Sequence, residues 1–300
     1  MKLKTMKSNL PKNKRKRKIN IPHIFLVLIL CVYGFLILYP FYNSVLQSII
    51  PYKLAIRSPF LLFPTEIDFT SYQFIFHWDS LMYGFRTTFI IVVFGVLYNL
   101  FLTVTLSYVL SKPIPGRKII NLFIVFTMFF QGGLIPGYLL VKGLGMMDSY
   151  AAMIIPLGIN IMNLMIMRSY FQGIPDELSE AAKLDGAGEY TILLRICLPL
   201  SKPMLATIGL YYGVERWNEW YNGMLFMRSV EKWPLQLRIR DMIQSVGSVV
   251  NQIPEASRPT AYPLGIQMAG IVISIIPVAL IYPFLQKYFV KGLTLGGVKG

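Results

Sequence analysis

The fold of this chain is decided by the segment FIIVVFGVLYNLFLTVTLSYVL, which runs from Phe89 to Leu110. The segment holds no charged residue, and it exceeds the roughly 20 residues with which a helix crosses a hydrocarbon core about 30 Å thick. A second apolar block, from Ile24 to Tyr39, approaches the same length. Soluble domains interrupt such runs with charged positions. The two blocks therefore predict an integral membrane protein.

The composition of the whole chain agrees with this prediction. Of the 300 residues, 55% are hydrophobic and 14% are charged, and the mean hydropathy is +0.55. We expect an all-α fold, that of a polytopic membrane protein with six transmembrane helices. The predicted spans are residues 22–48, 83–110, 118–134, 150–169, 204–226 and 263–285. Residues 21–300 then form one transmembrane domain, preceded by a basic, disordered tail of residues 1–20.

The net charge of +15 is concentrated beside the predicted spans. Nine basic and no acidic residues lie between Lys2 and Lys18, and Lys112, Arg117 and Lys118 follow the second predicted span. Basic residues beside spans hold their loops on the cytoplasmic side, so an even number of spans places both termini in the cytoplasm. Nucleic-acid binding is disfavoured, because no aromatic-interleaved RNA-binding motif accompanies these charges.

Cleavage of the N-terminus, disulfides and metal binding are also disfavoured. The first apolar block is not followed by a small-x-small cleavage site, since the first alanine is Ala55. Cys31 and Cys197 are too few for a disulfide framework, and we expect free thiols. His23 and His77 lie far apart in the sequence without other ligand residues nearby, so we expect no metal site.

The loop between the fourth and fifth predicted spans has the sequence GIPDELSEAAKLDGAGEYTILLRICLP, from Gly173 to Pro199. Pro175 suits the first turn of a helix, where its missing N–H is no loss. The acidic residues that follow it favour the positive end of the helix dipole. Gly186 suits a left-handed cap at the end of this helix. A second, more apolar helix is expected to stop at Pro199, so the loop predicts a helical hairpin that projects into the cytoplasm.

The hairpin sequence resembles the EAA loop of the permease subunits of ABC importers. The resemblance rests on Glu180-Ala181-Ala182, Gly186, Ile196, Leu198 and Pro199. In that family the loop forms coupling helices, which sit in a cleft of the nucleotide-binding subunit and transmit its closure to the spans. The resemblance implies a coupling loop over residues 170–203. The residues to which it assigns coupling are Glu180, Ala181, Ala182, Asp185, Gly186, Ile196 and Pro199.

The C-terminal sequence is similar to the ending of carbohydrate-importer permeases of the maltose-permease type, above all the second, six-span permease subunit. This stretch runs from Tyr282 to Gly300, and the resemblance extends over essentially the whole chain after residue 20. The sequence Gly-Gly-Leu-Ile-Pro from Gly132, and Trp217-Asn218 near Trp220, resemble a subgroup associated with oligosaccharides and larger glycans. The resemblance also implies a cytoplasmic tail of residues 286–300 that reaches the ATPase interface.

The family membership implied by these resemblances carries an architecture and a set of partners. It implies the transmembrane domain of a type I ABC importer, in a bacterial cytoplasmic membrane, that works by alternating access. The partners implied are a second permease subunit, two ATP-binding subunits and an extracytoplasmic solute-binding protein. ATP and Mg²⁺ would be bound by the ATPase subunits, with no cofactor on this chain.

An enzyme is disfavoured, because the chain lacks a Gly-x-x-x-x-Gly-Lys-Ser/Thr phosphate loop and the common hydrolase motifs. The remaining alternative is an autonomous channel or ion-coupled transporter. Such proteins often contain inverted repeats with broken helices at matching positions. The sequence shows no such symmetry, and a coupling loop would have no role in them.

Polar residues inside the predicted spans are candidates for lining a substrate pathway, because they are costly in a membrane. Aromatic faces, amides and carboxylates suit a carbohydrate. The candidates are Asn99, Thr103, Asn160, Asn163, Tyr211, Glu215, Trp217, Asn218, Glu219, Trp220 and Tyr221. Alternatives remain open. The asparagines could hydrogen-bond between helices, and the aromatic residues near 220 could form an interfacial belt. Glu215, Arg216 and Glu219 could pair among themselves or with the partner subunit.

Overall fold

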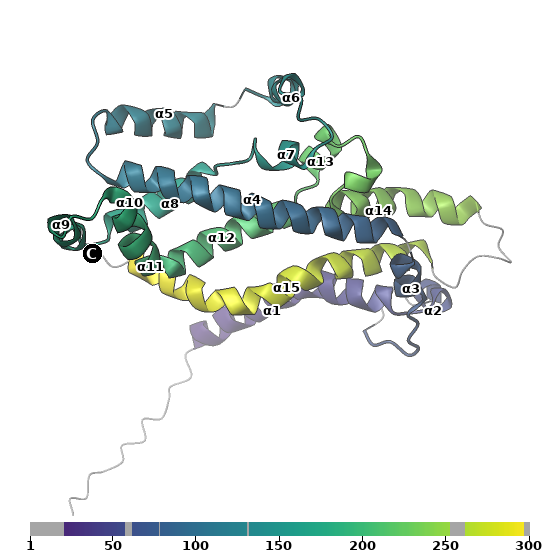
Figure 1. Ribbon diagram of the computed structural model, residues 1–300. Coiled ribbons are helices and arrows are strands. Elements are labelled where there is room, and N and C mark those ends of the chain that lie inside the picture. Colours follow the sequence, from purple (N-terminus) through teal and green to yellow (C-terminus); the bar gives the residue numbers. More distant parts are fainter. Residues whose placement is uncertain (1–20, 58–61, 78, 131, 253–261, 297–300) are drawn as a thin grey trace, which may run out of the picture. The chain divides into compact units, whose positions relative to one another are not determined.

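The computed structural model describes residues 21–57, 62–77, 79–130, 132–252 and 262–296, and every regular element in these ranges is helical (Figure 1). The predicted basic tail of residues 1–20 lies outside the described residues. The chain divides into two units, residues 1–43 and Ser44–Gly300. Most of α1 (Ile21–Ser48) belongs to the first unit, and its apolar side chains from Ile24 to Leu38 are largely exposed.

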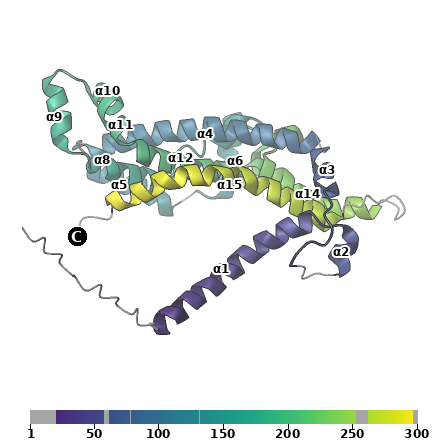
Figure 2. The same cartoon turned by 90° about the horizontal axis from the view of Figure 1, so that it is seen from below.

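The second unit is built around α4 (Asp79–Ser111), the helix that contains the deciding apolar segment. Helix α4 packs against α8 (Ile161–Gln172), α12 (Lys202–Trp217) and α14 (Leu235–Gln252). Helix α15 (Pro263–Gly296) lies along α12 and α14 (Figure 2). The long helices are thus held side by side by contacts that run along most of their length.

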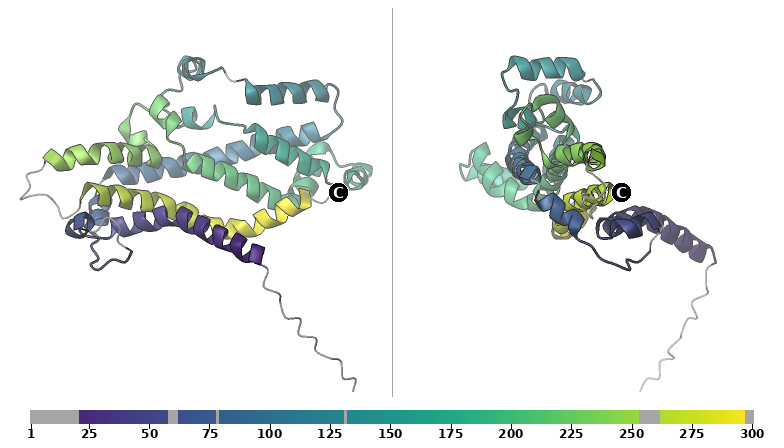
Figure 3. Two further views of the ribbon diagram at one scale, coloured as in Figure 1. Left: turned by 180° about the vertical axis from the view of Figure 1, so that it is seen from behind. Right: turned by 90° about the vertical axis from the view of Figure 1, so that its right-hand side faces the viewer.

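The two ends of this bundle carry different short elements (Figures 1 and 3). At one end, called the hairpin end below, lie α9 (Asp176–Leu184), α10 (Glu189–Ile192) and α11 (Leu198–Leu200). The opposite end carries α2 (Tyr52–Arg57), α3 (Thr70–Phe76), α13 (Tyr221–Phe226) and most of α14. Helices α5 (Arg117–Phe129) and α6 (Leu134–Gly143) expose most of their side chains.

By length and composition, three helices in the described part of the chain can cross a membrane: Ile24–Ser48, Leu81–Ser111 and Pro263–Ile281. Two bent pairs raise the number to five if each pair is one span. These pairs are Arg117–Phe129 with Leu134–Gly143, bent by 110°, and Glu189–Leu200 with Lys202–Trp217, bent by 83°. The protein is therefore an all-helical membrane protein with three to five spans by this measure.

The fourth predicted span, residues 150–169, was wrong as a continuous helix. The structure has α7 (Tyr150–Ile154), a non-helical stretch, and then α8 from Ile161. Pro156 and Gly158 lie in the gap. Proline lacks a backbone N–H and disfavours a helical residue before it, and glycine destabilises a helix interior. The span was predicted from its apolar composition, which does not register the effect of Pro156 and Gly158 on the helix.

Other predicted boundaries also shift. The fifth predicted span, 204–226, is interrupted after Trp217 and resumes as α13, and the third, 118–134, ends at Phe129. The last helix continues beyond residue 285 to Gly296, through part of the predicted tail of residues 286–300. Residues 297–300 lie outside the described part of the chain.

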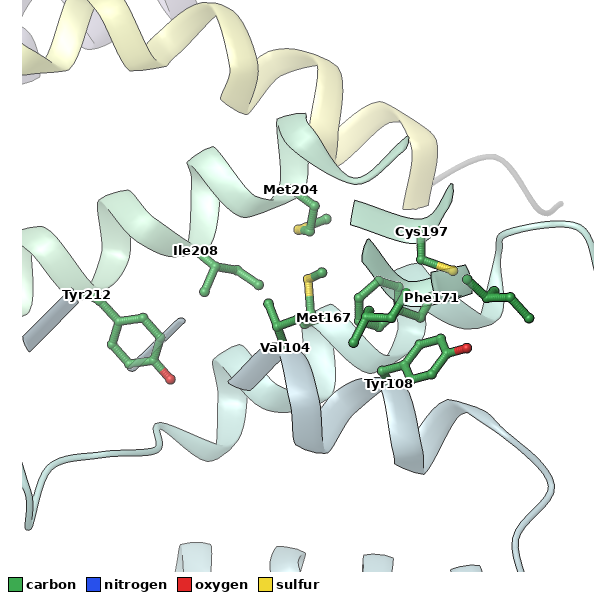
Figure 4. Packing of buried hydrophobic residues seen from close by; sticks show 10 residues of the cluster. Val104, Tyr108, Met167, Phe171, Cys197, Met204, Ile208 and Tyr212 are labelled. Atoms are coloured by element: carbon green, nitrogen blue, oxygen red, sulfur yellow. The ribbon is translucent and has the colours of Figure 1, made fainter. Parts of the chain in front are cut away.

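The apolar core of the hairpin end joins α4, α8, the second arm of the hairpin and α12 (Figure 4). Tyr108 meets Phe171 edge-on, with ring centroids 5.8 Å apart. The buried members of this cluster are Val104, Tyr108, Met167, Phe171, Ile192, Leu193, Cys197, Met204, Ile208 and Tyr212. The hairpin is therefore attached to the bundle through apolar contacts as well as polar ones.

At the opposite end, Asp148 links the segment before α7 to the segment after α13. Its carboxylate accepts hydrogen bonds from the backbone N–H groups of Arg228 and Ser229, from the Ser229 hydroxyl and from Lys232 Nζ. The bonds from Ser229 contribute most to holding the pKa of the Asp148 carboxyl well below its usual value. Asp148 has a φ of 57°, which Asp and Asn tolerate better than most residues.

Candidate functional site

The first arm of the hairpin is α9, and it ends as its sequence predicts. Gly186 has a φ of +82°. The Gly186 N–H donates to the Lys183 carbonyl at 3.0 Å, and the Ala187 N–H donates to the Ala182 carbonyl at 2.9 Å. This pair of bonds is the Schellman arrangement, which requires a left-handed residue at the position of Gly186.

The second arm begins at Glu189 and ends at Leu200, one residue after the predicted stop at Pro199. A π-helical turn from Leu193 to Cys197 precedes the proline. Proline removes one helical hydrogen bond and its ring crowds the carbonyl four residues earlier. A wider turn relieves that crowding, and such turns often occur at functional sites.

The residues assigned to coupling lie on the hairpin with two kinds of environment. Glu180, Ala181, Asp185 and Pro199 are exposed, whereas Ala182 and Ile196 are half-buried against the cluster of Figure 4. Two apolar residues that the sequence analysis did not single out are also exposed: Leu184 is 90% and Tyr190 84% exposed. A monomeric soluble surface rarely presents such large apolar side chains together.

Polar contacts attach the hairpin to the end of α4. Tyr108 Oη donates to Glu189 Oε2 at 2.6 Å, and Lys183 Nζ lies 2.7 Å from Glu189 Oε1. The bond to Glu189 raises the pKa of the Lys183 ammonium. Lys112 Nζ donates to Ser179 Oγ at 3.3 Å. Sequence reasoning missed the contacts of Tyr108 with Glu189 and of Lys112 with Ser179, because the residues of each pair are distant along the chain.

The break between α7 and α8 is held by Arg216 of α12. Arg216 is 2% exposed. Its Nη1 donates to the Met153 carbonyl at 2.7 Å, and its Nη2 donates to the carbonyls of Ile154 at 3.3 Å and Leu157 at 2.6 Å. These carbonyls would otherwise lack helical partners. In the described residues Arg216 forms no ion pair with Glu215 or Glu219, so the expectation that these residues pair among themselves was wrong.

Asn99 of α4 completes the contacts around the break. Its side-chain oxygen accepts from Arg216 Nε and Nη2, and its Nδ2 donates to the carbonyls of Leu157 at 2.6 Å and Gly158 at 2.7 Å. One turn further along each helix, Thr103 Oγ1 and Tyr212 Oη lie 2.7 Å apart. Tyr212 Oη also accepts from the Asn160 backbone N–H at 3.0 Å. We call Asn99, Thr103, Tyr212 and Arg216 the clasp.

Several pathway candidates therefore have another role in this structure. Asn99 and Thr103 are fully buried in the clasp, and Asn163 is buried in α8. The Asn160 side chain caps α8 by accepting from the N–H groups of Met162 and Asn163. Sequence reasoning placed these four residues on a substrate pathway and left hydrogen bonding between helices open for the three asparagines. Asn99 makes such bonds in this structure, whereas the Asn160 side chain bonds within α8.

The other pathway candidates lie around the end of α12. An exposed polar stripe on this helix consists of Tyr211, Glu215 and Asn218. Tyr221 is exposed beyond the end of α12. Glu219 accepts from the backbone N–H and the side-chain amide of Asn222. The stripe is the part of the predicted pathway that remains accessible in the single chain.

The two tryptophans of the candidate pathway lie in packed surroundings. Trp217 Nε1 donates to the Ser274 carbonyl at 3.0 Å, and the ring lines an apolar cavity of about 420 Å³ between α4, α12 and α15. The guanidinium of Arg240 lies 3.8 Å from the centroid of the Trp220 ring. Both rings therefore have partners within the chain.

The described chain thus combines long apolar helices, a helix break held by the clasp, and a hairpin that exposes large apolar side chains. No family model matches the chain. It is 38% identical to the polygalacturonan/rhamnogalacturonan transport system permease protein YtcP of Bacillus subtilis, over 90% of this chain and 97% of that one. It is 40% identical to protein LplC of the same organism, over 83% and 84% of the two chains.

A solved structure agrees with the two relatives. It is the crystal structure of a bacterial ABC transporter involved in the import of the acidic polysaccharide alginate. The match has a TM-score of 0.82 and 34% identity, and it covers 90% of this chain and 96% of that one. The chain belongs to the carbohydrate permease family of ABC transporters. It is the non-catalytic, multi-pass membrane subunit, and the ATPase is a separate protein.

Proposed function

We propose that this chain moves an oligosaccharide into a bacterial cell, as one of two permease subunits in a heteromeric ABC importer of the cytoplasmic membrane. The observation that carries the proposal is the hairpin, with its exposed glutamate and apolar side chains. The oligosaccharide is supported by the relatives, one of which is a polygalacturonan/rhamnogalacturonan permease and another an importer of alginate. Oligosaccharides derived from polysaccharides of this kind are the class of substrate we assign.

The proposed topology has six crossings, with α7 and α8 together forming the fourth as a broken span. Non-helical backbone at membrane depth is tolerated where it is buried in protein. The clasp supplies this burial, because Arg216 and Asn99 bind the carbonyls of the break. Both termini and the hairpin are then cytoplasmic. Basic residues at the hairpin end, such as Lys112 and Arg117, support that orientation.

The hairpin is proposed to bind an ATP-binding subunit. Glu180, Ala181, Asp185 and Pro199 are exposed where a partner can reach them, and Leu184 and Tyr190 supply apolar contact area. A second permease subunit, two ATP-binding subunits and an extracytoplasmic solute-binding protein complete the assembly. ATP and Mg²⁺ belong to the ATP-binding subunits in this proposal, and this chain carries no cofactor of its own. Closure of the ATPases drives alternating access by favouring one conformation of the spans over the other.

The oligosaccharide is proposed to pass along the exposed polar stripe of α12. Tyr211, Glu215 and Asn218 share one face of this helix, because they are spaced by four and three residues. A hydroxyl, a carboxylate and an amide are suited to sugar hydroxyl groups. Tyr221 extends this surface towards the opposite end of the bundle.

The test is the ATPase activity of the purified complex in lipid, with and without the solute-loaded binding protein. We expect Glu180→Lys to abolish stimulation while the subunits remain assembled, because it reverses a charge on the docking surface. Glu177→Lys is the matched control, since it reverses an exposed charge in the first turn of the same helix. If the solute-loaded binding protein still stimulates the ATPase in the Glu180→Lys complex, Glu180 has no role in coupling. Solute transport by this chain alone, without an ATPase, supports an autonomous transporter instead.

A further inference from the structure

The carboxylate of Glu189 lies between the hairpin and α4. On one side it meets Lys183 Nζ at 2.7 Å, within the hairpin itself. On the other side it accepts a hydrogen bond from Tyr108 Oη at 2.6 Å. Only the second contact joins the hairpin to a long helix. Its length is typical of a charge-assisted hydrogen bond, which is stronger than a neutral one.

A second polar contact joins the same two elements. Lys112 follows Tyr108 by one helical turn, and its Nζ donates to Ser179 Oγ of α9 at 3.3 Å. The Lys112 ammonium also lies 5.3 Å from the centroid of the Tyr108 ring. One face of α4 therefore contacts both arms of the hairpin, α9 through Lys112 and α10 through Tyr108.

The same helix also holds the clasp. Helix α4 is continuous from Asp79 to Ser111, and its residues Asn99 and Thr103 bind the α7–α8 break and Tyr212. A continuous helix moves largely as one rigid element. A displacement of the hairpin that is passed to Tyr108 therefore reaches the clasp without any intervening loop.

We propose that Glu189 is a positioning residue for energy coupling, and that its hydrogen bond with Tyr108 passes movement of the hairpin to α4 and so to the clasp. This inference rests on the proposed function, since it requires an ATPase that moves the hairpin. It adds a specific contact to that function. The coupling residues of the sequence analysis face the partner, whereas Glu189 and Tyr108 join the hairpin to the spans.

The contact can be removed without dismantling the hairpin. The second arm is anchored by Ile192, Leu193 and Cys197, which are buried in the cluster of Figure 4. The Glu189 side chain is 51% exposed, so its replacement leaves no cavity. Tyr108→Phe removes one oxygen atom and leaves the ring packed against Phe171.

The experiment compares Tyr108→Phe, Glu189→Gln and the double variant in the complete complex, reconstituted in lipid with the ATPase and binding protein. The readouts are basal ATPase, ATPase stimulated by the loaded binding protein, and solute transported per ATP. We expect each single variant to lower transport per ATP by about tenfold, the factor that one hydrogen bond to a charged group supports. The double variant should lower transport per ATP no further than either single variant does, because both single variants remove the same contact.

Two control variants distinguish a role of the Glu189–Tyr108 contact in passing movement to α4 from a purely structural role. Lys183→Met removes the ion pair within the hairpin but leaves the Tyr108 contact, so we expect wild-type coupling. Glu177→Gln neutralises another exposed carboxylate of the hairpin, and it should also leave transport per ATP unchanged. Wild-type transport per ATP in Tyr108→Phe overturns the proposal, and so does loss of assembly in that variant, since the contact would then be structural. Failure of the wild-type complex to couple ATPase to transport contradicts the proposed function itself.

Discussion

Arg216 donates two hydrogen bonds to the side-chain oxygen of Asn99, from Nε at 3.1 Å and from Nη2 at 2.9 Å. The guanidinium is always charged, and it lies among helices with only neutral oxygen atoms as its partners. A buried cation of this kind is expensive in a membrane unless its donors are satisfied. Here the carbonyls of a broken helix and one amide satisfy them, so the cation and the helix break stabilise each other.

Replacement of Arg216 by methionine should destabilise the protein. The change leaves buried carbonyls at the break and the Asn99 oxygen without donors, and leaving a buried acceptor unsatisfied costs about 1–3 kcal/mol. The free energy of unfolding of the purified complex in detergent measures the loss. Arg228→Met is the control, because Arg228 is exposed and only its backbone N–H is used by Asp148. Equal stability of the two variants would show that the clasp contributes nothing.

Gly95 allows Arg216 to lie against α4. A Cβ at Gly95 would be 3.1 Å from Arg216 Nε, which is closer than most real contacts. We expect Gly95→Ala to lower the free energy of unfolding by about 1–2 kcal/mol through overpacking. Gly209→Ala is the matched control in α12, since its nearest neighbour is 3.5 Å away. A variant at Gly95 as stable as the one at Gly209 contradicts this packing argument.

Asp148 should make the stability of the opposite end depend on pH. Its folded pKa is lowered by hydrogen bonds, chiefly from Ser229, so the contribution is present above the ordinary carboxyl value of about 3.9 and is lost as the pH falls below it. Asp148→Asn keeps a residue that tolerates a positive φ but removes the charge. The difference in unfolding free energy between wild type and Asp148→Asn should shrink between pH 5 and pH 2. A constant difference over that range would exclude the linkage.

Substitutions on the exposed stripe of α12 should alter transport without altering stability. Glu215→Gln and Asn218→Ala remove groups proposed to contact sugar hydroxyls, so the KM for transport should rise by up to tenfold, or about 1.4 kcal/mol. Their unfolding free energies should stay within about 0.5 kcal/mol of wild type. Glu231→Gln, an exposed carboxylate outside the stripe, is the control. An unchanged KM in both stripe variants would show that the substrate does not pass along the exposed polar stripe of α12.

The hairpin was the most predictable part of the structure, because its signals are local. Pro175 precedes α9, the acidic pair occupies its first turn, and Gly186 adopts the left-handed cap. Each signal acts within a few residues of where it occurs in the sequence. The extension past Pro199 was not predictable in this way, because it depends on a π-helical turn and on packing against α8 and α12.

The helix break was the least predictable part, although Pro156 and Gly158 mark it. An apolar window averages over two such residues, and no local signal shows which side chains will bind the freed carbonyls. The partners come from Asn99 and Arg216, which are far from residue 156 and from each other in the sequence. Asn99 and Thr103 were recognised as polar residues inside a predicted span, but their role depends on the neighbouring helix, which periodicity does not reveal.

In the proposed topology, where α7 and α8 form one broken span, we expect the clasp to set an order of assembly during synthesis. Helices α7 and α8 leave the ribosome before Arg216 has been made, and each is too short to cross a bilayer alone. Their unwound carbonyls acquire the last donors only when α12 enters the membrane beside α4. In nascent chains that end before residue 216, the carbonyls between α7 and α8 therefore lack their Arg216 donors. We expect this segment to stay in contact with the membrane-insertion machinery until then. We therefore expect translation past Arg216 to be the step at which this proposed span becomes stable.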